Sequence, residues 1–396
     1  MLSDLDSLSS SLLYAYIRSQ SPPKQAFTPL YIPLVHIRAA DLSIRPEFLA
    51  LLPYANLEPS HVITLDDLPQ DLETGLPCEN TRWILVDHNV LQGELGAVYS
   101  NRVTGVIDHH EDEGKVPADT GDEPRIIEKT ASCSSLVTGY VKEAWDRLSS
   151  QSGSSKNDNN DGIKEEDDDG ADPRVWDAQA ATLAMASILI DSSALQDQNK
   201  TTPHDKQAVA YLEAKIKADP QAGASWDQKA FYEKIDAAKR DLDSLSLDEV
   251  LRKDYKEWNA GDMKLGVSSV VKPLPFLIDK AVSESGSEGK DDKKAFDKAL
   301  KAFAKERKLG LFSIMTTSQT KQGKFQRELL LWGLSDKATE AAKRFEEQSS
   351  KELGLQKWDG NADIPEASEG WRKVWWQKEV QHSRKRVAPL LREAMS

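Results

Sequence analysis

The sequence predicts an α/β protein of two domains, the first built on a parallel sheet and the second a smaller α/β domain. In the first half of the chain, short apolar runs alternate with helical or loop segments of about ten to twenty residues, a rhythm typical of a parallel sheet. A second alternating region begins near residue 263. With 396 residues, of which 39% are hydrophobic, the chain is long enough to form two hydrophobic cores.

Four apolar runs in the first half are predicted to be buried strands. They are PLYIPLVHI (29–37), HVITL (61–65), RWILVDH (82–88) and VTGVIDHH (103–110). After RIIEK (125–129), the segment TASCSSLVTGYVKEAW predicts an amphipathic helix with a serine cap, and Ser132 and Ser134 lie at its start. The alanine-rich run DAQAATLAMASILID (177–191) predicts a buried helix.

The second half predicts a separate domain after a charged helical connection. We place the first domain at residues 1–205, the connection at 206–246 and the second domain at 247–396. Strands are expected within 263–274, 308–317 and 328–334, with a helix over 292–307 that follows a flexible stretch at 283–292. Trp371, Trp375 and Trp376 have helical spacing, and we interpret them as core residues.

Charge and composition exclude several classes of protein. The net charge is −14, and the segment 157–170 alone contributes −6, so residues of about 150–172 are expected to be a disordered acidic insertion. Basic residues are few and mixed with acids, which argues against nucleic-acid binding. No run reaches the ~18 apolar residues of a membrane helix. Two cysteines and the early acids Asp4 and Asp6 favour a cytoplasmic protein without a leader peptide.

Polar residues gather at the ends of the apolar runs, where parallel sheets place their ligand sites. For any one of them, a turn or a helix cap is the simpler interpretation, but together they form a set that can hold metal ions. Carboxylates mixed with imidazoles suit Mn²⁺, Mg²⁺ or Co²⁺, and two such ions ~4 Å apart form a clamp for phosphoryl transfer. The set comprises Asp4, Asp6, Asp87, His109, His110 and Asp191.

Four motifs, which contain these residues in order along the chain, point to one superfamily. DLDSLSSSL, ILVDHNVL, GVIDHHED and ILIDSSAL resemble, in order, the four motifs of the DHH superfamily of phosphoesterases. The segments YIPLVHIRAADLSIRPE and RKDYKEW…GVSSVVKPL resemble fungal exopolyphosphatase, a branch related to family II inorganic pyrophosphatases and to prune-type phosphodiesterases. Near the C-terminus, HSRKRVAPLL resembles the SRK motif of the family's second domain, so the resemblance covers nearly the whole chain.

The resemblance implies roles for the metal-site residues. Asp6, His109 and Asp191 would ligate one divalent ion, Asp4 a second, and Asp87 would bridge the two. Asp108 would fix the ring of its neighbour His109, as metal-bound histidines usually require, and His110 would face the substrate as a catalytic residue. For His88, a role in the site and simple packing at the strand end both stay open.

The resemblance also implies which residues grip the substrate. Lys256, Arg384 and Lys385 would bind phosphate, whereas Arg386 and Lys253 are interpreted as ordinary charges. Ser132 and Ser134 are expected to cap their helix rather than bind phosphate. The implied activity is that of a monomeric exopolyphosphatase, in which a water activated by two metal ions releases orthophosphate from the end of polyphosphate. Pyrophosphate or a cyclic nucleotide is the alternative substrate.

The first motif departs from the family pattern. The family has Gly-Asn or Gly-His before Asp-x-Asp, and counting back four residues from Asp4 lands before Met1. The buried strand that normally precedes this motif is also missing. We therefore expect that the chain is an N-terminally truncated gene model. The alternative is a catalytically impaired protein kept as a binding module.

Overall fold

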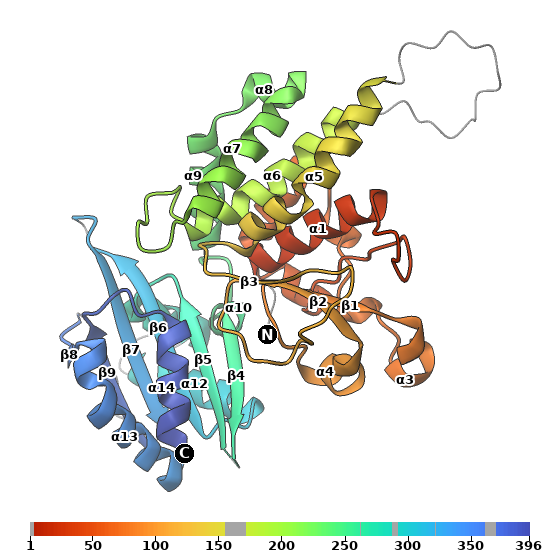
Figure 1. The fold of residues 1–396 in the computed structure, drawn as a ribbon. Coiled ribbons are helices and arrows are strands. Elements are labelled where there is room, and N and C mark those ends of the chain that lie inside the picture. The colour runs from red at the N-terminus through yellow and green to blue at the C-terminus, as the bar shows by residue number, and fades with distance from the viewer. Residues whose placement is uncertain (1–3, 155–171, 262, 287–291, 321, 361–369) are drawn as a thin grey trace. The chain divides into compact units, whose positions relative to one another are not determined.

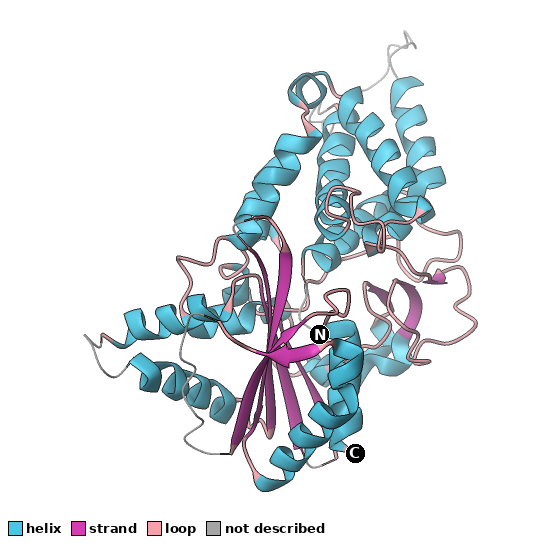
Figure 2. Cartoon of the chain, turned by 90° about the vertical axis from the view of Figure 1, so that its left-hand side faces the viewer, coloured by secondary structure: helices cyan, strands magenta, loops and turns pink. Residues whose placement is uncertain are grey.

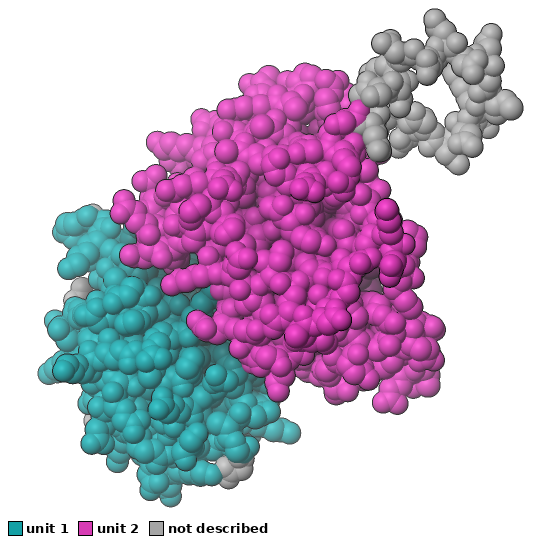
Figure 3. Space-filling view, in the orientation of Figure 1, with its two compact units in different colours: residues 1–2, 240–396 teal, residues 3–239 magenta. Residues whose placement is uncertain are grey.

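The chain forms two compact units in the computed structural model, which describes residues 4–154, 172–261, 263–286, 292–320, 322–360 and 370–396 (Figure 1). The N-terminal unit comprises Ser3–Lys239, and the C-terminal unit begins at Arg240 (Figure 3). This division lies inside the segment 206–246 that we predicted to connect two domains. Both units combine helices with a sheet, so the prediction of an α/β fold is confirmed (Figure 2).

The N-terminal unit contains a three-stranded parallel sheet in the order β1-β2-β3. Its strands are β1 (Trp83–Val86), β2 (Val103–Asp108) and β3 (Arg125–Ile127). The predictions at 82–88 and 103–110 are thus confirmed as somewhat shorter strands. Val86 lies opposite Ile107, so β1 and β2 end together at one edge of the sheet.

The strands predicted at 29–37 and 61–65 are wrong. Residues 29–34 have no regular structure, and contact between the two segments is limited to a bridge from Val35 to Thr64 with flanking backbone hydrogen bonds. Pro29 and Pro33 explain the failure of the first strand, because proline has no N–H to donate to a sheet. Leu30 and Ile32, which we expected in the core, are 60% and 62% exposed.

Helices make up most of the N-terminal unit. The longer ones are α1 (Leu5–Gln20), α5 (Cys133–Ser154), α6 (Pro173–Asp191), α7 (Pro203–Ala218) and α9 (Gln228–Arg240). The shorter ones are α2 (Pro46–Leu51), α3 (Leu72–Gly75), α4 (Gly93–Tyr99) and α8 (Pro220–Ser225). α1 packs on α5 and α6, and the small side chains of α6 allow close contact with α7. The predicted helix at 177–191 is therefore confirmed, with an additional turn at its start.

Six short 3₁₀ segments complete the unit between α1 and β2. They are Ala39–Leu42, Leu52–Ala55, Pro59–His61, Leu65–Asp67, Cys78–Asn80 and Ser100–Arg102.

The C-terminal unit is built on a six-stranded mixed sheet in the order β4-β5-β6-β7-β9-β8. Its strands are β4 (Tyr255–Ala260), β5 (Met263–Val270), β6 (Leu311–Gln319), β7 (Phe325–Gly333), β8 (Leu355–Lys357) and β9 (Trp371–Gln377). Of the neighbouring pairs, β5 and β6 run parallel and the others antiparallel. The three strands predicted in this half are confirmed.

Helices cover both faces of this sheet. They are α10 (Leu247–Lys253), α11 (Leu274–Ser285), α12 (Asp292–Glu306), α13 (Asp336–Leu353) and α14 (Arg384–Met395). α13 and α14 pack on one face, where Leu265, Leu329 and Phe345 belong to a single apolar core. On the other face, Phe303 of α12 stacks against Phe312 of β6 at a centroid distance of 5.2 Å.

The tryptophans near the end of the chain lie on a strand, not a helix. Trp371 and Trp375 share one face of β9, and Trp376 points to the other. A spacing of four residues fits both the helical and the strand repeat, which is why the pattern misled us. Trp375 is buried in the core as we predicted, whereas Trp376 donates a hydrogen bond to Asp359.

Two predicted flexible segments are only partly described. Most of the acidic insertion at about 150–172 lies outside the described residues, and its first residues continue α5 to Ser154. In the stretch 283–292, α11 continues to Ser285, and residues 287–291 lie outside the described residues. Among the described helices, none has the length and apolar character needed to cross a bilayer.

Candidate metal centre

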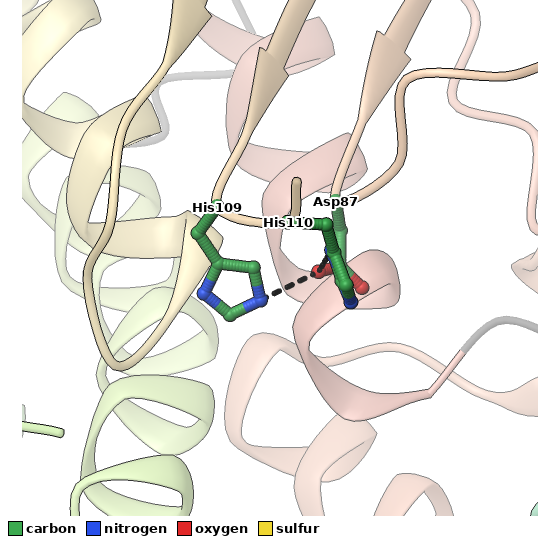
Figure 4. Close-up of side chains that lie close together, drawn as sticks. All are labelled: Asp87, His109 and His110. Atoms are coloured by element: carbon green, nitrogen blue, oxygen red, sulfur yellow. Dashed lines mark ion pairs between the residues drawn. The ribbon is translucent and has the colours of Figure 1, made fainter. Parts of the chain in front are cut away.

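Asp87 stands at the centre of a cluster of ionisable side chains where β1 ends. Its φ of 62° is left-handed, a conformation that aspartate tolerates better than most residues, and its N–H donates to the Ile107 carbonyl at 3.0 Å. The carboxylate accepts a hydrogen bond from Ser7 Oγ at 2.6 Å, and its Oδ1 lies 3.2 Å from His109 Nε2. The turn thus aims Asp87 at the residue that follows β2 (Figure 4).

His109 is oriented by a backbone carbonyl. Its Nδ1 lies 3.1 Å from the Thr130 oxygen, and a carbonyl only accepts, so Nδ1 carries a proton. The other nitrogen, Nε2, points toward Asp87 and lies 3.9 Å from Asp6 Oδ2. This is the orientation in which a neutral imidazole offers its lone pair to a cation.

Asp108 holds the ring of His110. Its Oδ1 accepts from His110 Nδ1 at 2.8 Å, and Asn89 Nδ2 donates to the other oxygen at 2.6 Å. Burial alone would raise the pKa of Asp108, but these hydrogen bonds lower it to about 2. We had assigned Asp108 to the ring of His109, which is wrong, because the Thr130 carbonyl already occupies that nitrogen.

Asp6 caps α5 from a distance of 127 residues in sequence. Its carboxylate accepts from the N–H groups of Cys133 at 2.6 Å and Ser134 at 3.0 Å. Ser132 Oγ also donates to it at 2.7 Å. The prediction of a serine cap is therefore wrong, because the serine hydroxyl donates to the capping carboxylate. Asp6 therefore contacts the start of α5, and its Oδ2 also lies 3.9 Å from His109 Nε2.

The remaining predicted ligands, Asp4 and Asp191, lie at helix ends. Asp4 is the exposed N-cap of α1 and accepts from the N–H groups of Asp6 and Ser7. Asp191 is the last residue of α6, and burial, followed by the charge of Asp6, raises its pKa to about 7. Burial and the charges of Asp4 and Asp6 raise the pKa of Asp87 to about 8.

Asp87, His109 and His110 together could hold a divalent cation. The ligand atoms of Asp87, His109 and His110 all lie within 4.8 Å of one another. They offer the mixture of carboxylate oxygen and imidazole nitrogen that Mn²⁺, Co²⁺ and Mg²⁺ accept to differing degrees. The raised pKa of Asp87 reflects burial first and then the negative charges of Asp4 and Asp6, and a bound cation would offset both. Ligation by Asp4, Asp6 and Asp191, and bridging by Asp87, stay predictions.

His88 is not part of this cluster. Burial lowers its pKa to about 3, so the ring is neutral. Among the described residues, the group whose atoms converge comprises Asp87, His109 and His110 without it. The packing interpretation of His88 is the one these observations favour.

Sequence patterns did not reveal Asp205, a buried residue of α7 that organises the loop after β3. Its carboxylate accepts from Thr130 Oγ1 at 2.7 Å, Ser135 Oγ at 2.7 Å and the Ala131 N–H at 3.2 Å. The same loop presents the Thr130 carbonyl to His109 and donors to Asp6. One carboxylate therefore supports two predicted ligands. Only the Thr-x-x-Asp capping pattern at 202–205 marks it in the sequence.

Replacing Asp205 by alanine is expected to weaken divalent-metal binding by ~10–100-fold, the usual cost of losing a residue that orients a ligand. Isothermal titration calorimetry with Mn²⁺ measures this change. Asp219→Ala is the control, because Asp219 caps α8 through the N–H groups of Gln221 and Ala222. Both changes cost ~1 kcal/mol of helix capping, and Asp205→Ala also removes the acceptor for Thr130, Ala131 and Ser135. Equal metal affinity in the two variants would contradict the role of Asp205.

The predicted substrate residues all lie in the C-terminal unit. Arg384 begins α14, and its guanidinium contacts the carboxylate and the carbonyl of Asp254 at 2.6 and 2.7 Å. Lys256 is the second residue of β4, and the Lys385 N–H donates to Ser383 Oγ. Arg386 forms an exposed ion pair with Glu352, in agreement with its interpretation as an ordinary charge. Phosphate binding by Lys256, Arg384 and Lys385 stays a prediction.

Three comparisons relate this chain to known proteins. The family model described as the DHHA2 domain matches residues 233–394. A Schizosaccharomyces pombe protein that carries the provisional name exopolyphosphatase is 28% identical, over 99% of this chain and 88% of its own length. The exopolyphosphatase PRUNE1 of Homo sapiens is 24% identical over 70% of this chain, which spans about half (52%) of PRUNE1.

The fold also has a solved counterpart. The crystal structure of a Methanococcus jannaschii protein, provisionally named a family II inorganic pyrophosphatase, superposes with a TM-score of 0.55. The match covers 99% of this chain and 96% of that one at 19% sequence identity. At this identity it shows that the two chains share a fold.

Proposed function

Because this chain belongs to the DHH superfamily of phosphoesterases, we propose that it hydrolyses terminal phosphoanhydride bonds of inorganic polyphosphate with bound divalent metal ions. The convergence of Asp87, His109 and His110 where β1 and β2 end is the observation that carries this proposal. The names of the relatives supply the substrate class, since both are called exopolyphosphatases.

Each residue of the cluster has a distinct task in this reaction. Asp87 and His109 would hold metal, His109 through Nε2 because Thr130 occupies Nδ1. His110 is the more exposed histidine, at 20% against 6% for His109. Asp108 keeps a proton on His110 Nδ1, which leaves Nε2 to exchange a proton with the substrate. When bound, divalent ions supply Lewis acidity to the phosphate oxygens and acidify the attacking water.

The assignment is tested by orthophosphate release from long polyphosphate, tripolyphosphate and pyrophosphate, and by AMP formation from cyclic AMP, each with Mn²⁺ or Mg²⁺. The expected result is metal-dependent release of orthophosphate from long polyphosphate, which shortens gradually without fragments of intermediate length. Early mid-length fragments would contradict cleavage from the end. A preference for pyrophosphate or cyclic AMP would replace polyphosphate as the substrate, and no hydrolysis of any of these compounds would contradict the proposal.

A further inference from the structure

Arg327 is a largely buried arginine on β7 without an acidic partner among the described residues. Its Nε donates to the Val380 carbonyl at 2.6 Å, and its guanidinium lies 5.1 Å from the Phe325 ring centroid. Burial lowers its pKa to about 10. The buried Arg18, in contrast, pairs with Glu123. A cation held out of water without a counter-ion costs free energy, and a bound anion would recover it.

The register of the sheet places Arg327 on the face that α13 and α14 cover. It alternates with Leu329 and Leu331, which belong to the core on that face. Lys256 of β4 lies opposite Val267, another member of the same core, and therefore points to the same face. β5 and β6 lie between β4 and β7, so three strand spacings of ~4.8 Å put ~14 Å between the two cations across the sheet. Val267 pairs with Ser313 and Arg327 with Thr317, so the register adds about four residues, or ~13 Å, along the strands, and the backbone positions lie ~20 Å apart.

The two cations also lie toward the same end of the sheet. Arg327 pairs with Thr317, two residues before the end of β6, and Lys256, the second residue of β4, pairs with Val267, three residues before the end of β5. Because β5 and β6 run parallel, their ends meet at one edge. This edge therefore carries positive charge at β4 and again at β7.

The loop before α14 crosses the same edge. Its Val380 carbonyl rests on Arg327, and the Gln377 amide donates to the carbonyls of Glu379 and His382. After this loop, Arg384 begins α14 and reaches Asp254 immediately before β4. The loop and the start of the helix thus run from Arg327 back toward Lys256. We call the residues Lys256, Arg327, Arg384 and Lys385 the basic edge.

We propose that the basic edge binds a chain of several linked phosphates, and that Arg327 contacts phosphates beyond those held by Lys256, Arg384 and Lys385. This proposal rests on the proposed function. A guanidinium with its terminal nitrogens available offers paired donors to phosphate oxygens. Pyrophosphate has only two phosphate groups and is too short to reach across ~20 Å, whereas long polyphosphate spans this distance. Arg327 is therefore a residue that selects substrate length.

The test compares Arg327→Gln, which removes the charge, with Arg327→Lys, which keeps it. Arg386→Gln is the control, because it removes an equal charge from the same unit at an exposed ion pair. KM and kcat are measured for long polyphosphate and for pyrophosphate in the full chain with Mn²⁺. Binding of long polyphosphate to the metal-free chain is measured in parallel by calorimetry at several salt concentrations.

We expect Arg327→Gln to raise KM for long polyphosphate about tenfold, the loss of one charged hydrogen-bonded contact. KM for pyrophosphate and both kcat values should stay unchanged, and Arg327→Lys should keep most of the affinity. In the binding measurement, the slope of log affinity against log salt should fall by about one for Arg327→Gln. Arg386→Gln should behave as the parent chain in every measurement.

Two results would overturn the proposal. An unchanged KM for long polyphosphate would show that no phosphate reaches Arg327. An equal loss with pyrophosphate, not rescued by Arg327→Lys, would show that Arg327 only clamps the Val380 loop. If the parent chain releases no phosphate at all, the proposed function fails, while the binding measurement still decides whether Arg327 contacts polyphosphate.

Discussion

Replacing Asp87 by asparagine is expected to reduce metal-dependent phosphate release by more than ~100-fold, because loss of a ligand exceeds the ~10–100-fold cost of losing a residue that orients one. Asparagine keeps the shape of the side chain and tolerates the φ of 62° at this position. The change therefore removes the charge of the proposed metal ligand without straining the turn after β1. Phosphate release with Mn²⁺ and calorimetric Mn²⁺ titration measure the two losses together.

The same variant has an opposite effect on the metal-free chain. With its pKa raised to about 8, Asp87 keeps a proton in the folded state at pH values where the unfolded chain, with a pKa near 3.8, has lost it. Folding therefore becomes less favourable as pH rises from about 4 to about 8. Asp87→Asn removes this contribution, so its metal-free melting temperature should fall less over that range. Metal binding at pH 7 should also release fewer protons in the variant.

Asp122→Asn is the matched control, because it removes one negative charge from an exposed site in the same unit. It should leave activity, metal affinity and the pH dependence of melting unchanged. If Asp87→Asn keeps phosphate release within a few-fold of the parent, Asp87 is not a metal ligand. If both variants show the same pH dependence of melting, Asp87 is not protonated in the folded chain.

The centre of the site could be predicted from sequence because it depends on local features. Apolar runs end at Val86 and at Ile107, and parallel strands bring their ends to one edge. Asp87 and His109 therefore meet by geometry alone. The orientation of the His109 ring could not be predicted, because it depends on the Thr130 carbonyl, 21 residues later, and on Asp205, which holds Thr130 from much further along the chain.

The errors in the fold have similar causes. Apolar composition at 29–37 suggested a strand, but Pro29 and Pro33 cannot donate to a ladder, and the segment remains largely irregular. A spacing of four residues between Trp371 and Trp375 fits a helix and a strand alike, and only pairing with β7 decides it. The cap of α5 could not be predicted either, because Asp6 supplies it from 127 residues away and leaves no pattern in the sequence near the helix.

Removing the carboxylate of Asp297 is expected to destabilise the C-terminal unit by ~3–5 kcal/mol, because it removes an acidic partner of a buried guanidinium. Arg372 has a side chain that is 1% exposed, and Asp297 lies 2.9 Å from its Nη1. The guanidinium also lies 5.1 Å from the Trp332 ring centroid, where water cannot replace the lost partner. Asp297→Ala should therefore lower the free energy of unfolding measured by urea titration with tryptophan fluorescence.

The paired change decides whether charge or packing causes the loss. In Asp297→Leu with Arg372→Met, both charges disappear and apolar volume stays, so stability should return to within ~1 kcal/mol of the parent or exceed it. Glu346→Ala is the control, because Glu346 pairs with the exposed Lys373 next to Arg372 and should cost less than ~1 kcal/mol. A paired variant as unstable as Asp297→Ala would mean that the pair fills space in the sheet rather than neutralising a buried charge. A loss in Glu346→Ala equal to that in Asp297→Ala would mean that burial does not set the strength of these ion pairs.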